Sequence, residues 1–345
     1  MRRVYLDNNA TTRLHPRVAE VMKGALAAPP SNPSSIHAFG RDARNQLTRA
    51  RRTLAELMGC RPSEILFTSS ATEALNTLLR SVPRKTVTSA TEHIAVLSAL
   101  PHATVLQGGP LTPDQIPEGT ELICAMSANN ETGLLTDIEA LASLDIPLVV
   151  DAVAHLGKEP LTLHPNASYV FSGHKLHGPL GIGFAIVRHH HPFTPLITGG
   201  AQESNRRAGT ENLPAILGLV EAVRIAIEEP AHEQMRTLRK RLEADFEVNG
   251  MGPRLSNTAN LYFPDVDGEG LLMNLDLAGI AVSHGSACSS GSLEPSHVLL
   301  GMGYSRKRAA SSLRFSLSRF TTEEEIDDAL SVLCRLTVEQ KAMAH

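Results

Sequence analysis

A lysine in a glycine-flanked loop is the residue of this chain whose type and setting most suggest chemistry. Lys175 lies in SGHKLHG, residues 172–178, between the apolar runs SYVF and IGFAIV. Those runs predict two strands, which would hold the loop and its lysine in place. The amine of a lysine held in this way can form a Schiff base with a carbonyl compound. A surface lysine on a strand connector has the same local sequence, so the interpretation depends on the rest of the site.

Two further features suit a cofactor that carries both a phosphate and a pyridine ring. SSATEALNTLL places Ser70, Ala71 and Thr72 at the start of a predicted helix, where backbone N–H groups can bind a phosphate. LVVDA places Asp151 at the carboxyl end of a buried strand, where a carboxylate can pair with a pyridine nitrogen. Each feature alone is also an ordinary helix cap or turn residue. Together with Lys175 they form three parts of one pyridoxal phosphate pocket.

The elements that must position these residues alternate between strands and helices. This alternation predicts an α/β fold with a mostly parallel sheet covered by helices. From about residue 246 the elements are shorter, and the last helix follows TTEEE, where Thr321 or Thr322 can act as the cap. At 345 residues the chain predicts two domains. We expect a large cofactor-binding domain of residues 15–245 and a small domain of residues 1–14 and 246–345. The expected strands are ILFTS, TVTSA, ELICAM, PLVVDA, SYVFSG and IGFAIV.

The composition argues against several functional classes. With 32 basic and 36 acidic side chains the net charge is close to neutral, so we expect no nucleic acid and no membrane among the partners. The arginines of RDARNQLTRARRTLAELMG lie on other helix faces than its alanines and leucines, as on a solvated helix. No apolar run approaches the roughly 20 residues needed to span a bilayer, and MRRVYLDNN lacks the apolar core of a signal peptide. We therefore expect a cytoplasmic protein.

The cysteines and histidines give no sign of a metal site. The four cysteines include no CxxC pair, which argues against a zinc knuckle or a disulfide framework. Cys124 and Cys334 fall in apolar patterns and are expected in the core, and Cys60 follows a helix-ending glycine. Cys288 differs because its neighbours in GSACSSG are small, polar and flexible, so its thiol could swing between two partners. The histidines of HKLH and of residues 189–191 lie in turn-like sequences, which favours solvated turns and no metal.

Seven motifs, in order along the chain, resemble those of the cysteine desulfurases. These are class V pyridoxal-phosphate enzymes of aminotransferase fold type I, and the resemblance runs from residue 5 to about 330. It implies a mostly parallel seven-stranded sheet in the large domain and a smaller α+β domain that carries the cysteine loop. The motifs are YLDNNATT, TEHIAV, NNETG, SGHKLHGPLGIG, RRAGTEN, SHGSACSSGSLEPSHVL and RFSLSRFTTEEEID.

The resemblance assigns a role at the cofactor to each matching residue. Lys175 would hold pyridoxal 5'-phosphate as a Schiff base, and Ser172 and His174 would bind its phosphate. Ala71 and Thr72 would supply the phosphate contact at the helix start.

The pyridine ring and the second subunit would involve four more residues. His93 would stack on the ring and take part in catalysis, Asn129 would hydrogen-bond a ring substituent and contact the substrate, and Asp151 would pair with the ring nitrogen. Thr210 matches a threonine that in the family reaches the phosphate bound to the other subunit. This match implies a homodimer.

The implied reaction converts L-cysteine to L-alanine. Arg314 would bind the substrate carboxylate with its two-pronged guanidinium. Lys175 would take the α-proton, and the Cys288 thiolate would attack the substrate sulfur to leave an enzyme persulfide. That sulfur would pass to an acceptor protein, such as an iron-sulfur scaffold or a thiolation relay, which the motifs do not name.

Two positions depart from the family pattern. Ala154 stands in DAVAH where the family has a glutamine that bonds the cofactor's phenolic oxygen, and we do not expect the adjacent His155 to replace it. His284 stands where a small hydroxyl residue is common. Two alternatives therefore stay open: another class V reaction, such as that of a selenocysteine lyase or an aminotransferase, and a catalytically weak scaffold for sulfur-pathway partners.

Overall fold

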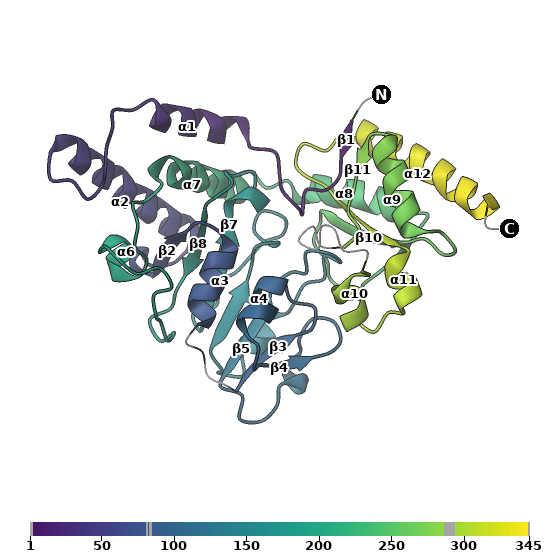
Figure 1. The fold of residues 1–345 in the computed structure, drawn as a ribbon, viewed down its shortest axis with the longest axis horizontal. Coiled ribbons are helices and arrows are strands. Elements are labelled where there is room, and N and C mark those ends of the chain that lie inside the picture. Colours follow the sequence, from purple (N-terminus) through teal and green to yellow (C-terminus); the bar gives the residue numbers. More distant parts are fainter. Residues whose placement is uncertain (1–2, 81, 83–84, 286–293, 344–345) are drawn as a thin grey trace.

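A mixed sheet of seven strands forms the centre of the larger part of the molecule (Figure 1). The computed structural model describes residues 3–80, 82, 85–285 and 294–343. The order across the sheet is β2-β8-β7-β6-β5-β3-β4. Strand β8 runs antiparallel to β2 and β7, and the other neighbours are parallel. The strands are β2 (Ile65–Thr68), β3 (Thr86–Ser89), β4 (Thr104–Leu106), β5 (Leu122–Met126), β6 (Leu148–Asp151), β7 (Ala167–Ser172) and β8 (Gly183–Ile186).

The six strands predicted from apolar runs are all present, and the mostly parallel seven-stranded α/β fold is confirmed. The seventh strand, β4, escaped prediction because it is a three-residue edge strand, TVL, without a buried residue. Central strands are instead buried on both faces and read as continuous apolar runs.

Helices cover both faces of the large sheet because successive strand side chains point to opposite sides. In β6, Val149 packs on the face covered by α3 and α4, while Val150 packs on the face covered by α1, α2 and α7. Figure 1 shows these two helical layers on either side of the strands. The helices of this part are α1 (Pro16–Leu26), α2 (Ala38–Met58), α3 (Ala71–Leu79), α4 (Ile94–Ala99), α5 (Ile138–Ala142), α6 (Gln202–Asn205) and α7 (Leu213–Glu228).

A second core lies around a three-stranded antiparallel sheet of order β12-β10-β9. Strand β1 (Val4–Tyr5) joins this side by pairing with β11 (Ile280–Ala281), so both ends of the chain lie there (Figure 1). The other elements are α8 (His232–Glu243), β9 (Glu247–Val248), β10 (Thr258–Tyr262), α9 (Gly268–Leu277), α10 (His297–Gly301), α11 (Arg306–Ala310), β12 (Ser312–Ser316) and α12 (Glu323–Met343). The domain boundaries expected at residues 14 and 245 stay a prediction.

Local signals at the C-terminal helix were only partly correct. Thr322 forms the expected capping box: its hydroxyl accepts from the Glu325 N–H at 3.2 Å, and the Glu325 carboxylate accepts from the Thr322 N–H at 3.0 Å.

The expectation that Cys334 is buried is wrong, because it lies on the solvent side of α12. Cys124 is buried as expected, and burial raises the pKa of the partly buried Cys60 to about 11.

None of the described helices is long and apolar enough to cross a membrane. Within the same residues, no group of three or more histidine, cysteine, aspartate or glutamate side chains could hold a metal ion.

Candidate active site

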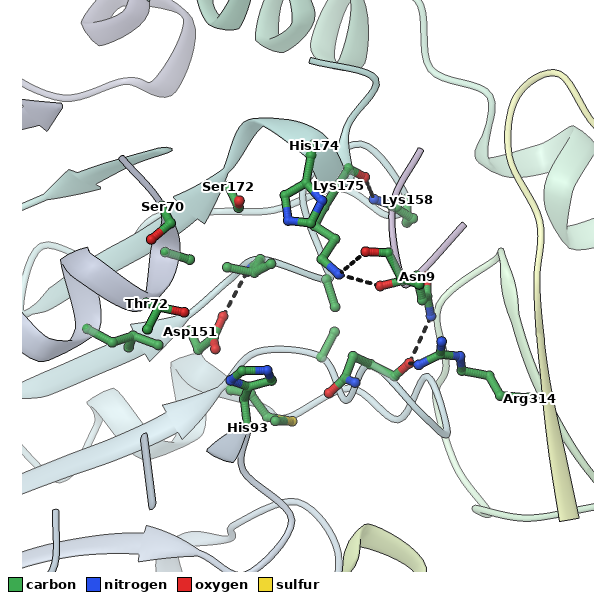
Figure 2. A pocket seen from close by; sticks show the side chains of 18 residues that line it. Asn9, Ser70, Thr72, His93, Asp151, Lys158, Ser172, His174, Lys175 and Arg314 are labelled. Carbon is green, nitrogen blue, oxygen red and sulfur yellow. Dashed lines mark hydrogen bonds between the residues drawn. The ribbon is translucent and has the colours of Figure 1, made fainter. Parts of the chain in front are cut away.

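A cavity of about 190 Å³ lies at the carboxyl edge of the large sheet, facing the second core. Strands β5, β6 and β7 are parallel, so their last residues Met126, Asp151 and Ser172 meet at this edge. Figure 2 shows side chains from separate elements pointing into the space. The cavity is lined by Asn9, Ala10, Ser70, Ala71, Thr72, Leu75, His93, Met126, Ala128, Asn130, Asp151, Val153, Ala154, Lys158, Ser172, His174, Lys175 and Arg314.

Lys175 reaches into this cavity from a single 3₁₀ turn, Gly173–Lys175, that follows β7. The turn is tight: a Cβ on Gly173 would lie 2.9 Å from the Pro179 carbonyl oxygen, so glycine is needed there. The Lys175 ammonium donates to the main-chain carbonyls of Asn9 and, at 2.8 Å, of Ala10 (Figure 2). The N-terminal segment therefore holds the end of the lysine inside the cavity.

One end of the cavity is formed by the start of α3. Ser70 caps this helix by accepting from the Glu73 N–H at 3.1 Å. The N–H groups of Ala71 and Thr72 belong to the first turn, whose amides have no carbonyl partner within the helix. The Ser172 hydroxyl lines the same end. These donors, with the positive end of the helix dipole, form a site suited to an anion.

Asp151 and His93 form the floor of the cavity (Figure 2). One Asp151 oxygen accepts from the Val153 N–H at 3.0 Å, and burial raises the pKa of the carboxyl group. His93 begins α4, where its Nδ1 accepts from the Ala95 N–H, and burial lowers the pKa of its ring. A neutral imidazole beside a buried carboxylate suits a flat cationic ring, which could stack on one and pair with the other.

The other end of the cavity is formed by Arg314 of β12. This arginine is 1% exposed, and its guanidinium donates to the Asp7 carboxylate at 2.6 Å and to the Asn130 carbonyl at 3.2 Å. Its buried Nε has no partner among the described residues. A buried guanidinium with unused donor capacity is suited to binding a carboxylate.

Asn129 does not line the cavity, contrary to the role expected for it. Its side-chain oxygen accepts from the N–H groups of Glu131 and Thr132, both at 2.9 Å, and its amide donates to the Thr91 carbonyl. The side chain is thus used to hold the NNETG turn. The next residue, Asn130, is the asparagine of that motif that faces the cavity. Adjacent residues of a turn point in different directions, and the spacing in the sequence did not say which one faces inward.

The remaining predicted residues lie in the following places. His174 lines the cavity, with a pKa lowered to about 4 by burial and then by the charges of Lys175 and Lys158. Thr210 lines a separate open hollow with Ser69 and Arg207, so its expected contact with a partner's phosphate stays a prediction. Cys288 lies outside the described residues.

The structure also shows where the residues at and beside the departures from the family pattern lie. Ala154 lines the cavity with only a methyl group. His155 does not replace a polar group there, because it is buried behind the wall with its Nε2 3.2 Å from the Pro160 carbonyl oxygen. The His284 Nε2 lies 2.9 Å from the Ala310 carbonyl oxygen, which directs that ring to the end of α11.

Sequence reasoning missed three polar residues of the cavity wall: Asn9, Asn130 and Lys158. Asn9 and Asn130 lie inside the motifs YLDNNATT and NNETG, so the motifs marked the segments without singling out these side chains. For Lys158 the sequence held no signal, because a lysine followed by glutamate and proline reads as a surface turn.

The chain belongs to the class V aminotransferase family, whose sequence model matches residues 4–329. A cysteine desulfurase from Nostoc sp. is 39% identical over 377 aligned positions, which cover 99% of this chain and 94% of that relative. NifS, a cysteine desulfurase of Azotobacter vinelandii, is 41% identical over 361 positions, covering 94% and 90% of the two chains. Because 377 positions exceed the 345 residues of this chain, such relatives carry segments that it lacks.

Solved structures agree with the sequence comparisons. A NifS-like protein superposes with a TM-score of 0.88 at 33% identity, over 98% of this chain and all of the other. SspA in complex with cysteine superposes with a TM-score of 0.79 at 30% identity, over 92% of this chain and all of the other. The family and the cysteine desulfurases within it depend on pyridoxal phosphate.

The residues of the cavity fit that cofactor. A Cβ on Gly183 would lie 2.9 Å from the Ser70 carbonyl carbon and 3.1 Å from the Ala71 nitrogen, so only glycine lets β8 pass so close to the start of α3. The buried Asp151 can pair with a ring nitrogen, and the unpartnered Nε of Arg314 can serve a carboxylate at the opposite end.

Proposed function

We propose that this protein is a pyridoxal-phosphate-dependent cysteine desulfurase that converts L-cysteine to L-alanine and retains the sulfur on Cys288. The observation that carries the proposal is the arrangement of one cavity: Lys175 between a helix-start anion site and a buried arginine, above the floor formed by Asp151. That order matches the parts of an amino-acid substrate joined to the cofactor. The full-length similarity to proteins named cysteine desulfurase supports the choice of reaction.

Bound pyridoxal phosphate would supply an electron-withdrawing ring that stabilises negative charge at the substrate α-carbon. The first-turn amides of Ala71 and Thr72 would hold its phosphate, with Ser172 and His174 beside them. Burial lowers the pKa of His174 to about 4, so its ring would approach the phosphate as a neutral hydrogen-bonding group.

Two residues would orient the ring. Asp151 would keep the ring nitrogen protonated, because a cation beside this buried carboxyl group favours its ionised form. His93 would lie against the ring face and exclude water from it. Both side chains are fixed by main-chain N–H groups, of Val153 and Ala95 respectively, so neither has to be ordered when the cofactor binds.

Three residues would act on the substrate. Arg314 would bind the carboxylate of L-cysteine, with Asp7 fixing the plane of the guanidinium. Asn130, in place of the expected Asn129, would hydrogen-bond the substrate or the cofactor ring from the cavity wall. Once its amine is released from the cofactor, Lys175 would remove the proton from the substrate α-carbon. It would then donate that proton to a neighbouring atom.

The sulfur transfer itself is assigned to Cys288 on the strength of the motif. The C–S bond of L-cysteine breaks, the sulfur joins the Cys288 sulfur as a persulfide, and the β-carbon takes a proton to give alanine. Two thiols enter, and one persulfide and one alanine result, so no outside oxidant or reductant is needed. The described flanks of this loop are fixed: Ser283 pairs with Arg314 of β12, and the Ser296 hydroxyl donates to the buried Glu131.

A homodimer and a sulfur-acceptor protein belong to the same proposal. Thr210 lies outside its own chain's cavity, on a loop tied to the start of α3 by the Arg207–Glu73 ion pair at 2.9 Å. From that position it can serve a second copy of the chain. We also propose the division at residue 245 as the boundary between the two domains.

The test is a single-turnover assay of the purified protein with L-cysteine. We expect a yellow protein that forms one alanine for each persulfide. Cys288→Ser should abolish persulfide formation and leave the visible spectrum unchanged, whereas Lys175→Ala should lose the yellow colour. Alanine without persulfide would point to another class V reaction, and cofactor binding without either product would point to a scaffold.

A further inference from the structure

A second lysine, Lys158, lies in the wall of the cavity that holds Lys175 (Figure 2). It is only 6% exposed, and its ammonium donates a hydrogen bond to the main-chain carbonyl of Lys175. Among residues 3–80, 82, 85–285 and 294–343, no carboxylate lies within ion-pair distance of it. Burying an ammonium without a counter-ion costs free energy.

The groups around Lys158 come from several elements. On its cavity side it shares the wall with Lys175 and His174 of the turn after β7, Asp151 of β6 and His93 of α4. On its other side it lines a hollow of about 20 Å³ with His177, Glu229 and Arg319. Burial, followed by the charge of Lys175, lowers the pKa of Lys158 to about 7, so Lys158 is cationic over the part of a pH titration that lies below neutrality.

Two ammonium groups in one poorly hydrated cavity repel each other, so the pair gives up a proton more readily than two separate lysines would. The protons leave such a pair in two steps that belong to both groups. Only a free amine can form a Schiff base, and a cationic neighbour is one physical means of keeping a lysine amine free.

The contact between the two lysines also restrains the main chain. Lys158 donates a hydrogen bond to the carbonyl of Lys175, and the Lys175 side chain donates to the carbonyls of Asn9 and Ala10. A substitution at Lys158 therefore alters the main chain from which the Lys175 side chain extends. Ala154, in the same stretch of wall, has no polar side-chain group. Of the residues from 152 to 158, Lys158 is therefore the one that contributes a polar side chain to the cavity wall.

We propose that Lys158 is a positioning residue for Lys175, whose positive charge favours loss of the proton from the Lys175 nitrogen and whose hydrogen bond holds the main chain there. The inference rests on the proposed function, because it assigns Lys175 to the cofactor. It deepens that function by naming the group that sets the protonation of the reactive nitrogen.

The test is a pH titration of the visible absorption band of the holoenzyme, which reports protonation at the Lys175 nitrogen without any turnover. Lys158→Gln keeps a donor for the carbonyl and removes the charge. We expect its midpoint to rise by about one pH unit, because the proton on Lys175 is no longer repelled. Lys158→Arg restores a cation and should return the midpoint toward the parent value. Lys307→Met, which removes a charge from an exposed lysine, should leave the midpoint unchanged.

Equal midpoints in the parent and Lys158→Gln would overturn the proposal. Equal shifts in the Gln and Arg variants would overturn it as well, since shape and not charge would then be responsible. If Lys158→Gln does not fold, as judged by circular dichroism, Lys158→Met is titrated with the same expectation. A parent protein without a visible band would instead refute the proposed function, so the two failures can be told apart.

Discussion

Arg314 and Asp7 form an ion pair at 2.6 Å although they are 307 positions apart in the chain. The pair joins β12 to the N-terminal segment that also contacts Lys175 through Asn9 and Ala10. Both the Arg314 end and the Lys175 end of the cavity therefore depend on residues 7–10. A helix-free segment near the N-terminus thus contributes directly to the geometry of the site.

We expect Asp7→Asn to weaken the use of L-cysteine. The amide can still accept one hydrogen bond, but Arg314 loses the charge that fixes its plane, so the KM for L-cysteine should rise about tenfold with a smaller change in kcat. A tenfold change corresponds to about 1.4 kcal/mol, close to the lower end of the range for charged hydrogen bonds. Steady-state kinetics measure the effect, and an unchanged KM would show that Asp7 does not orient Arg314.

The two asparagines of NNETG allow a matched comparison. Asn130→Ala should lower kcat/KM at least tenfold and leave the stability near that of the parent, because its side-chain amide faces the cavity. Asn129→Ala should lower the free energy of unfolding by about 1–3 kcal/mol, because it leaves the N–H groups of Glu131 and Thr132 without their acceptor.

Urea unfolding and steady-state kinetics on both variants separate the two roles. The reverse pattern, with Asn129→Ala stable and inactive, would restore the assignment made from the motif.

Ser70→Ala should reduce both stability and cofactor binding. Loss of the cap on α3 costs about 1 kcal/mol in typical helices. The same change loosens the first turn, whose amides would hold the phosphate, so pyridoxal phosphate should dissociate faster. Ser305→Ala, which removes the cap of the short surface helix α11, provides the control and should leave cofactor binding unchanged.

Glu92 makes stability depend on pH. It is 1% exposed, and burial raises its pKa well above the usual value, so the folded protein holds a proton that the unfolded chain releases above roughly pH 4.3. The stability contributed by this group is therefore present at low pH and is lost as pH rises toward the folded pKa, by about 1.4 kcal/mol per pH unit.

Glu92→Gln carries no such proton and keeps an acceptor for the Met126 N–H, which Glu92 holds at 2.7 Å. Its stability relative to the parent should increase steadily from pH 5 to pH 8 in urea unfolding. A constant difference over that range would mean that Glu92 is ionised in the folded protein.

The local sequence was sufficient to predict those parts of the site whose structure depends on residues close together in the chain. The strand before Asp151 and the strands around Lys175 are runs of apolar residues, and Ser70 and Thr322 cap the helices that directly follow them. Backbone hydrogen bonding and side-chain periodicity act over a few residues, so these features could be read along the chain.

The tertiary structure decided which side chains meet. The choice between Asn129 and Asn130 depended on the direction of one turn, and the exposure of Cys334 depended on which face of α12 packs on the second core. Lys158 gave no sign of burial in the sequence, since only packing shows that its ammonium lies beside Lys175. Contacts between distant segments depend on many packing interactions added together. Unlike a helix cap or a strand, such contacts leave no pattern in the local sequence.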